Sequence, residues 1–514
     1  MATLASRILG LARDQVLAAL FGAGNDMDAF IVAFRVPNLV RDLFAEGAMS
    51  AAFVPTFTKY LTLRGRTDAW RLANNLLNAL LIVTGIVVAG GMIFAPQIVR
   101  SYAGDFAAVP GKLELTVQLT RVVLPFLIMV AIAAAMMGML NSLHHYFLPA
   151  LAPATFNIAT IVGAVTLVPL MPRLGWPPIM AIAISAVIGG LAQIVTQWPA
   201  LRRQGFRYRA IFDPRDRGLR QVLLLMGPGT LGLAATQVNI FVNTLLATSQ
   251  GTGAVSWLNY AFRVMYLPIG LFGVSIATAV LPVVSQHAAV DDDEGIRETV
   301  SAGMALMLML NVPAMLGLIT LATPIVKLLF ERGRFLPADT ASTAAALRLY
   351  ALGLIGYSTA RIVAPTFYAL RQSRVPVIVS ACTVAANVVI SVVLVRLIGF
   401  QGLALGTSLA ALANGGLLVL LLRKRLRGIN GAALTVSLFK VTTAAAVMAL
   451  ATVGIEHGAG VIVASDGVGA QLFRLGLAIG GGLATLAAGA KLLKIREFGD
   501  AIELVRSRVS HGPS

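Results

Sequence analysis

The tetrapeptide Ala33-Phe34-Arg35-Val36 returns 228 residues later as Ala261-Phe262-Arg263-Val264. Matches at a spacing of 227 or 228 continue along the chain and join Leu39 to Leu267, Phe44 to Phe272, Arg121 to Arg348, Leu143 to Leu370 and Pro149 to Pro376. Agreement over about a hundred residues indicates an internal duplication of a large unit.

The composition indicates what kind of unit is duplicated. Of the 514 residues 58% are hydrophobic and only 12% are charged, with a mean hydropathy of +0.84, whereas soluble domains carry about 25% charged residues. Apolar blocks of about 20 residues, long enough to cross a bilayer, recur throughout. We predict fourteen membrane spans, at 2–22, 28–58, 72–95, 115–142, 149–171, 178–200, 221–249, 253–286, 300–325, 340–369, 375–398, 402–422, 432–455 and 470–490.

Each repeat then contains six spans, and an even number gives both repeats the same orientation in the membrane. The predicted fold is an all-α polytopic membrane protein, with two parallel six-helix lobes around a central cavity and two extra C-terminal helices. The predicted domains are the first lobe at 1–203, a basic cytoplasmic linker at 204–220, the second lobe at 221–427, the extra helices at 428–492 and an amphipathic tail at 493–514.

The distribution of positive charge predicts the orientation. With the N-terminus inside, 23 of the 40 Lys and Arg residues fall in inward loops and in the tail, which fits the positive-inside rule. Both termini are therefore expected in the cytoplasm. Basic clusters under long apolar spans argue against nucleic-acid binding as the reason for the net charge of +18. A single cysteine, Cys382, excludes an intrachain disulfide.

Several arginines lie inside the predicted spans, where each costs about 2.5–3.5 kcal/mol on insertion scales. They are Arg7, Arg13, Arg35, Arg41, Arg263 and Arg348. The planar guanidinium is always charged and donates paired hydrogen bonds to phosphate. These residues predict an anionic cargo.

The first two spans also carry acids. Arg7 and Asp14 fall on one helical stripe, with Arg13 pointing about 120° away. Pro37 should kink the long second span. An alternative role for Asp28 is a cap on the start of that span.

Local charge pairing is the alternative to cargo binding. Asp14, Asp28, Asp42 and Glu46 could neutralise the nearby arginines. Arg263 has no such neighbour, because no Asp or Glu occurs between Asp216 and Asp291. We expect ligand contact first for Arg263, and less for Arg121, Arg348, Arg361 and Arg474.

The opening of the chain resembles the MurJ/MviN lipid II flippases. The motifs that carry the resemblance are Ser6-Arg7-Ile8-Leu9-Gly10-Leu11-Ala12-Arg13-Asp14, Gly22-Ala23-Gly24, Asp28-Ala29-Phe30, Val36-Pro37-Asn38-Leu39-Val40-Arg41, Phe44-Ala45-Glu46-Gly47-Ala48, Ser256-Trp257 and Ala261-Phe262-Arg263. The resemblance implies the multidrug/oligosaccharidyl-lipid/polysaccharide exporter fold and an alternating-access cycle. Its implied cargo is undecaprenyl-pyrophosphoryl muropeptide (lipid II), carried to the outer leaflet for peptidoglycan synthesis.

The resemblance also implies site residues. Arg7, Arg13, Arg41 and Arg263 match the family's cavity arginines, and the residues implied beside them are Ser6, Asp14, Asp28, Asn38 and Glu46. The two extra spans are implied to form a groove for the lipid tail. A sodium site described in the family is only partly matched: Asn387 and Thr407 are suitable, but Ser391 stands where a carboxylate is expected.

Taken with the residues, the resemblance implies a monomeric transporter of the bacterial inner membrane, without a cofactor and without enzymatic activity. One alternative is a related exporter of polysaccharide-lipids or drugs. A cation exporter would show unpaired cavity acids, whereas arginine predominates here. An intramembrane lipid-modifying enzyme is the other alternative, but the only His pair, His144-His145, has no nearby acid.

Overall fold

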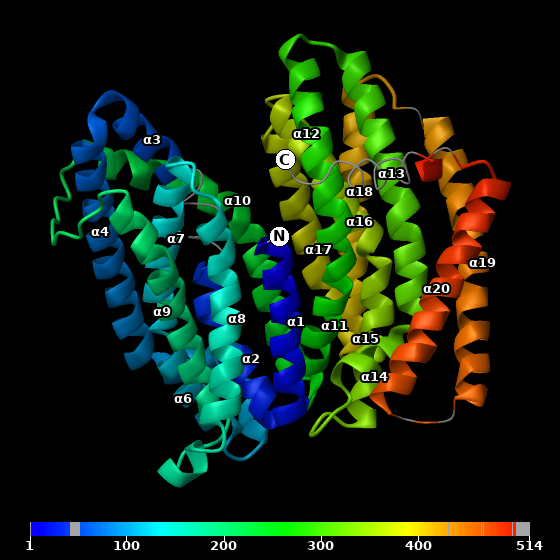
Figure 1. Ribbon diagram of the computed structural model, residues 1–514, viewed down its shortest axis with the longest axis horizontal. Coiled ribbons are helices and arrows are strands. Elements are labelled where there is room, and N and C mark those ends of the chain that lie inside the picture. The colour runs from blue at the N-terminus through cyan, green and yellow to red at the C-terminus, as the bar shows by residue number, and fades with distance from the viewer. Residues whose placement is uncertain are drawn as a thin grey trace. The chain divides into compact units, whose positions relative to one another are not determined.

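The computed structural model describes residues 2–41, 52–429, 431–463, 465, 467–495 and 497–499, and the regular structure in these ranges is helical (Figure 1). The helices of the first half are α1 (Ala2–Phe21), α2 (Asn25–Arg41), α3 (Val54–Leu63), α4 (Gly65–Ile93), α5 (Ala95–Ala103), η2 (Gly104–Ala108), α6 (Lys112–Val123), α7 (Phe126–Ser142), α8 (Phe147–Leu167), η3 (Met171–Leu174), α9 (Met180–Arg203) and α10 (Arg217–Thr248).

The helices of the second half are α11 (Ala254–Pro268), η4 (Ile269–Gly273), α12 (Val274–Ala289), α13 (Asp293–Thr320), α14 (Ala322–Phe330), α15 (Pro337–Leu352), α16 (Leu354–Ala369), α17 (Arg374–Ile398), α18 (Gln401–Arg425), α19 (Gly431–Ile462) and α20 (Val468–Leu492). The predicted amphipathic tail lies mostly outside the described residues.

Every predicted span contains helix, and ten stretches of the described chain are long and apolar enough to cross a membrane. The other four predicted spans correspond to α1, α2, α10 and the pair α15–α16. Three of these contain intramembrane arginines, on α1, α2 and α15–α16, so charge lowers their hydropathy. The prediction of a helical, multi-pass membrane protein is confirmed.

The helix bounds repeat at the spacing seen in the sequence. From α4 to α13 the start moves by 228 residues, and from α5 to α14 by 227; α7 and α8 precede α16 and α17 by the same two spacings. Backbone breaks repeat as well, since α6 and α7 part at Leu124 and α15 and α16 part at Gly353. The two six-span repeats therefore share one order of helices.

The chain divides into two compact units. The first comprises Met1–Ser256 with Arg332–Phe335, and the second comprises Trp257–Glu331 with Leu336–Ser514. Helix α10 falls in the first unit because it packs against α2, α3, α4 and α5. The lobe boundary predicted from the repeat, at 204–220, thus differs from this division and stays a prediction about the duplication.

In the first unit α8 packs on α1 and α9, and α7 lies between α9 and α4, as the blue-to-cyan ribbons of Figure 1 show. Aromatic residues fill the core between α3, α4 and α7: Phe53 and Phe57 are fully buried, and Phe57 contacts Trp70 with ring centroids 5.5 Å apart. Helix α2 continues through Pro37, which lines an apolar pocket of about 220 Å³.

In the second unit α18 packs on α15, α16 and α17, and the extra helices α19 and α20 pack on each other and on α13 and α14. Helix α13 begins at a cap, where the Asp292 carboxylate accepts a hydrogen bond from the Gly295 amide (2.9 Å). That bond, with a second one from His287, holds the pKa of Asp292 below its usual value.

A short turn at Arg332–Phe335 docks on the end of α1 in the first unit. The Arg334 amide donates to the Ala19 carbonyl (2.9 Å). Gly22 and Gly333 have φ values of +64° and +59°, and a Cβ on either would overlap a backbone carbonyl, of Arg334 and Ala19 respectively. Only glycine fits both the left-handed conformation and the close approach.

We expect Gly333→Ala to destabilise the protein. The substitution adds about 1–2 kcal/mol of left-handed strain and about 1–3 kcal/mol of overpacking against the Ala19 carbonyl. The measurement is the thermal unfolding midpoint of the purified protein in detergent. Gly175→Ala is the matched control, because Gly175 has φ +72° with nothing within 4 Å of an added Cβ. Equal midpoints for the two variants would show that the docked turn contributes nothing.

Candidate anion-binding site

The predicted site residues lie on three helices. Helix α1 carries Ser6, Arg7, Arg13 and Asp14, α2 carries Asp28, Arg35, Asn38 and Arg41, and α11 carries Arg263. Asp42 and Glu46 lie outside the described residues. The residues of α1 and α2 belong to the first unit and Arg263 to the second.

Arg13 and Asp14 form an ion pair on α1. The Nε and Nη2 atoms of Arg13 lie 3.2 and 2.9 Å from Oδ1 of Asp14, and the guanidinium lies 5.7 Å from the centre of the Phe156 ring. The expectation that Arg13 points away from the Asp14 stripe is therefore misleading, because the long side chain bends back to its neighbour. Local pairing is realised at this position.

Arg7, Asn38 and Arg41 are half-buried. Within the described part of the chain Arg7 makes no ion pair or hydrogen bond, so its five donors are available to a ligand. The backbone beside it is fixed, since Asn157 on α8 donates to the Ser6 carbonyl (3.1 Å).

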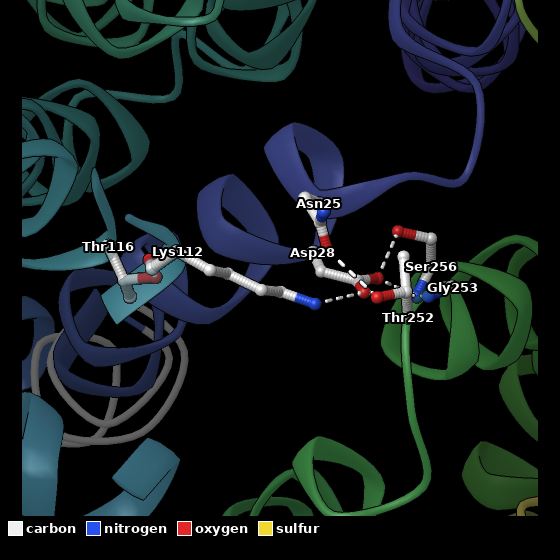
Figure 2. A network of polar contacts seen from close by, with 7 residues as sticks. All are labelled: Asn25, Asp28, Lys112, Thr116, Thr252, Gly253 and Ser256. Carbon is white, nitrogen blue, oxygen red and sulfur yellow. Dashed lines mark hydrogen bonds and ion pairs between the residues drawn. The ribbon is translucent and has the colours of Figure 1, made fainter. Parts of the chain in front are cut away.

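Asp28 lies at the centre of a buried polar network (Figure 2). Its side chain is fully buried and accepts from Lys112 Nζ at 2.9 Å, from the Gly253 amide at 2.8 Å, and from the amide and hydroxyl of Ser256 at 3.0 and 2.7 Å. Beside it Thr252 donates to Asn25 (2.8 Å).

This network places Asp28 at the start of α11. The amides of Gly253 and Ser256 belong to the first turn of that helix and its preceding residue, where backbone donors lack partners within the helix. A carboxylate there also complements the positive end of the helix dipole. Asp28 therefore caps α11, and the alternative that it caps its own helix is wrong. Its part in substrate binding stays a prediction.

Lys112 is the residue of this network that the sequence did not reveal. It is 3% exposed and lies 4.1 Å from the centre of the Phe106 ring. A lysine at the start of an apolar helix usually reaches water, and nothing in its local sequence indicates an ion pair 84 residues away.

Arg121 and Arg348, which correspond in the repeat, contact corresponding places. Arg121 donates to the Met92 carbonyl (3.1 Å) at the end of α4, and Arg348 donates to Thr323 (2.9 Å) at the start of α14. These are the junctions α4–α5 and α13–α14. The contacts support a structural role in bracing the junctions, and ligand contact stays a prediction.

Arg263 is exposed on α11 and lies beside an aromatic cluster of the second unit. The Phe262 ring stacks on Tyr266 at 5.9 Å and meets Tyr350 edge to face at 5.5 Å. Arg361 of α16 donates to the Tyr266 hydroxyl and lies 5.6 Å from its ring centre. Two arginines are thus associated with one aromatic surface.

The weaker candidates have protein contacts as well. Arg474 donates to the Ser465 carbonyl (3.2 Å). Asn387 and Ser391 are fully buried and bonded to each other (3.2 Å), and Thr407 donates to the Leu403 carbonyl (2.7 Å). The sodium role of Asn387 and Thr407 stays a prediction.

Removing Lys112 should destabilise the first unit. In Lys112→Met the Asp28 carboxylate stays buried without its charged partner, which typically costs about 3–5 kcal/mol. We expect a lower thermal unfolding midpoint in detergent, with part of the loss recovered in the double variant Asp28→Asn/Lys112→Met. Lys59→Met, at an exposed lysine of α3, is the control. Equal stability of Lys112→Met and Lys59→Met would contradict this account of the pair.

Comparisons with known proteins agree with this architecture. The sequence profile described as "Lipid II flippase MurJ" matches residues 17–462. A probable lipid II flippase MurJ of Bdellovibrio bacteriovorus is 35% identical over 477 residues, which cover 92% of this chain and 89% of the relative.

Solved structures are similar over most of the chain. A lipid II flippase MurJ in an inward closed conformation has a TM-score of 0.78 at 25% identity, covering 96% of this chain and 98% of that one. An inward-facing multidrug resistance MATE transporter of the MOP superfamily has a TM-score of 0.70 at 16% identity, covering 84% and 95%. The second likeness supports the two-lobe fold alone. By the profile match and the identity to its relatives, the chain belongs to the lipid II flippase MurJ family.

Proposed function

We propose that this protein carries lipid II from the inner to the outer leaflet of the bacterial inner membrane for peptidoglycan synthesis. The observation that carries the proposal is the set of arginines on α1, α2 and α11, inside an otherwise apolar helical protein of the MurJ family. Relatives across the matched length are named as lipid II flippases.

The pyrophosphate of lipid II is the group that these arginines suit. Each guanidinium can donate two parallel hydrogen bonds to phosphate oxygens, and the low dielectric of a membrane interior strengthens each charged contact. We assign pyrophosphate binding to Arg7, Arg13, Arg41 and Arg263. Around them, Ser6, Asp14, Asp28, Asn38 and Glu46 would orient the arginines and the sugar or peptide groups.

The Arg13–Asp14 pair suggests how binding is balanced. An unpaired guanidinium among apolar helices is costly, and the Asp14 carboxylate, 2.9 Å away, lowers that cost when no substrate is bound. A pyrophosphate would compete with Asp14 for the same donors. Asp14 would thus hold Arg13 ready for an anion.

Transport would follow alternating access, with the two repeats rocking about a central site. Helices α19 and α20 would accommodate the lipid tail, and both termini would face the cytoplasm. The protein would act as a monomer and a transporter, with no covalent change to its cargo. The fold shared with an inward-facing MATE transporter supports this cycle.

Replacing Arg263 should abolish transport. A lost charge-assisted contact of about 1.5–3 kcal/mol corresponds to roughly a 10- to 100-fold loss of affinity. We expect Arg263→Ala to fail to replace the native flippase in a depletion strain although it reaches normal membrane levels. Arg263→Lys should rescue poorly, because lysine lacks the planar fork.

The control for this experiment is Arg396→Ala, which removes an exposed arginine from the last turn of α17. It should support growth. Full complementation by Arg263→Ala would contradict the assignment of Arg263 to pyrophosphate binding.

A further inference from the structure

The connection between α9 and α10, residues 204–216, is held to α4 by three buried asparagines. Asn74, Asn75 and Asn78 are 2%, 2% and 6% exposed. They point toward a non-helical stretch of chain more than 130 residues away. We call residues 206–217 the asparagine-held loop.

Asn74 and Asn75 bond its backbone in the manner of neighbouring strands. Asn74 donates to the Arg207 carbonyl (3.0 Å) and accepts from the Arg209 amide (2.8 Å). Asn75 donates to the Asp213 carbonyl (2.9 Å) and accepts from the amide of the same residue (2.8 Å). Each side-chain amide therefore uses both of its polar atoms on the loop.

Asn78 and Phe206 complete the attachment. Asn78 donates to the carbonyls of Arg209 (2.9 Å) and Ile211 (3.0 Å), and its oxygen accepts from the Tyr208 hydroxyl (2.6 Å). Phe206 is 1% exposed and contacts Trp70 and Trp198, with ring centroids 5.3 and 5.9 Å apart. Surface loops seldom have this many buried anchors, so the loop has a fixed conformation.

The fixed loop presents positive charge. The arginines Arg207, Arg209, Arg215 and Arg217 are exposed, and none forms an ion pair within the described residues. The two acids of the loop are turned to backbone amides: Asp213 accepts from Arg215 N (2.9 Å) and Asp216 from Leu219 N (2.8 Å). Their carboxylates help to shape the backbone, and no arginine uses them as a partner.

The position of the loop along α4 places it at the edge of the membrane. Large exposed apolar side chains of α4 begin at Leu81, Ile82 and Val83, three residues beyond Asn78. At 1.5 Å per residue the lipid-facing surface begins about 4.5 Å from the loop along the helix axis. The exposed loop aromatics Tyr208 and Phe212, at 49% and 50% exposure, are of the kind enriched at membrane interfaces.

We propose that Arg207, Arg209, Arg215 and Arg217 of the asparagine-held loop bind the phosphate-bearing headgroups of anionic phospholipids in the leaflet next to the start of α4. Charge complementarity and depth favour this occupant: the arginines are unpaired, they are fixed in place, and they lie where lipid phosphates lie. The inference does not depend on which lipid the protein transports.

The end of α18 provides a contrast. It carries Arg423, Lys424 and Arg425, of which Arg425 pairs with Asp293 at 3.2 Å. This cluster has a similar charge but lacks the asparagine anchors. Equal charge without a fixed loop should bind lipid less selectively.

The test is a titration of the full chain in detergent with dioctanoyl phosphatidylglycerol, dioctanoyl phosphatidylcholine and inorganic phosphate. Tryptophan fluorescence is a suitable readout, because Trp70 and Trp198 contact Phe206 at the base of the loop. Phosphatidylglycerol should bind at least about tenfold more tightly than phosphatidylcholine, since each nearby arginine favours an anionic surface by about 1 kcal/mol. Inorganic phosphate should not reproduce the signal.

Two variants separate charge from conformation. Arg207→Gln/Arg209→Gln changes exposed side chains and should lower phosphatidylglycerol affinity by about tenfold. Asn78→Ala keeps every arginine but releases the loop, and it should lose much of the preference for phosphatidylglycerol. The control Arg423→Gln/Lys424→Gln removes the same charge from α18 and should change affinity by less than about twofold.

The outcomes are decisive. Equal loss in the loop variant and the α18 control would reduce the effect to general charge and overturn the site. Unchanged binding in Arg207→Gln/Arg209→Gln would overturn it directly. A folded Asn78→Ala protein with undiminished selectivity would show that the asparagines do not organise a lipid site.

Discussion

A charge among apolar helices persists only if a partner offsets its lost hydration, and this constraint governs the polar residues of both units. Asp28 meets it with Lys112 and the first turn of α11. Arg13 meets it with Asp14. Arg7 has no described partner, so it is a candidate for a ligand that brings its own negative charge.

The same constraint separates the structural arginines from the candidate ligand-binding ones. Arg121 and Arg348 donate to junctions between a long and a short helix, where carbonyls or hydroxyls lack helical partners. Because the repeat places both at corresponding junctions, their retention in a membrane span has a structural explanation. Arg7, Arg41 and Arg263 lie on α1, α2 and α11, away from those junctions, and carry the proposal of pyrophosphate binding.

The order of helices and the duplication were predictable from the sequence, because hydropathy and spacing are local or periodic signals. The break at Gly353, matching the break at Leu124, follows from the same repeat. Individual contacts were not predictable. Asp28 and Lys112 are 84 residues apart, and Asn75 meets Asp213 across 138 residues, so no local pattern marks either pair. The direction of Arg13 was misjudged because a long flexible side chain need not follow its Cα–Cβ vector. Asp42 and Glu46 lie outside the described residues and stay predictions.

The central claim is that arginines select the cargo through its pyrophosphate. The most direct measurement reconstitutes the purified protein in liposomes with lipid II on one leaflet and follows its appearance on the other. A parallel sample contains the same lipid with a neutral linkage in place of the pyrophosphate. The account predicts that lipid II crosses at least about tenfold faster than the neutral analogue, since each lost charged contact costs about 1.5–3 kcal/mol. Equal rates for the two lipids would contradict it.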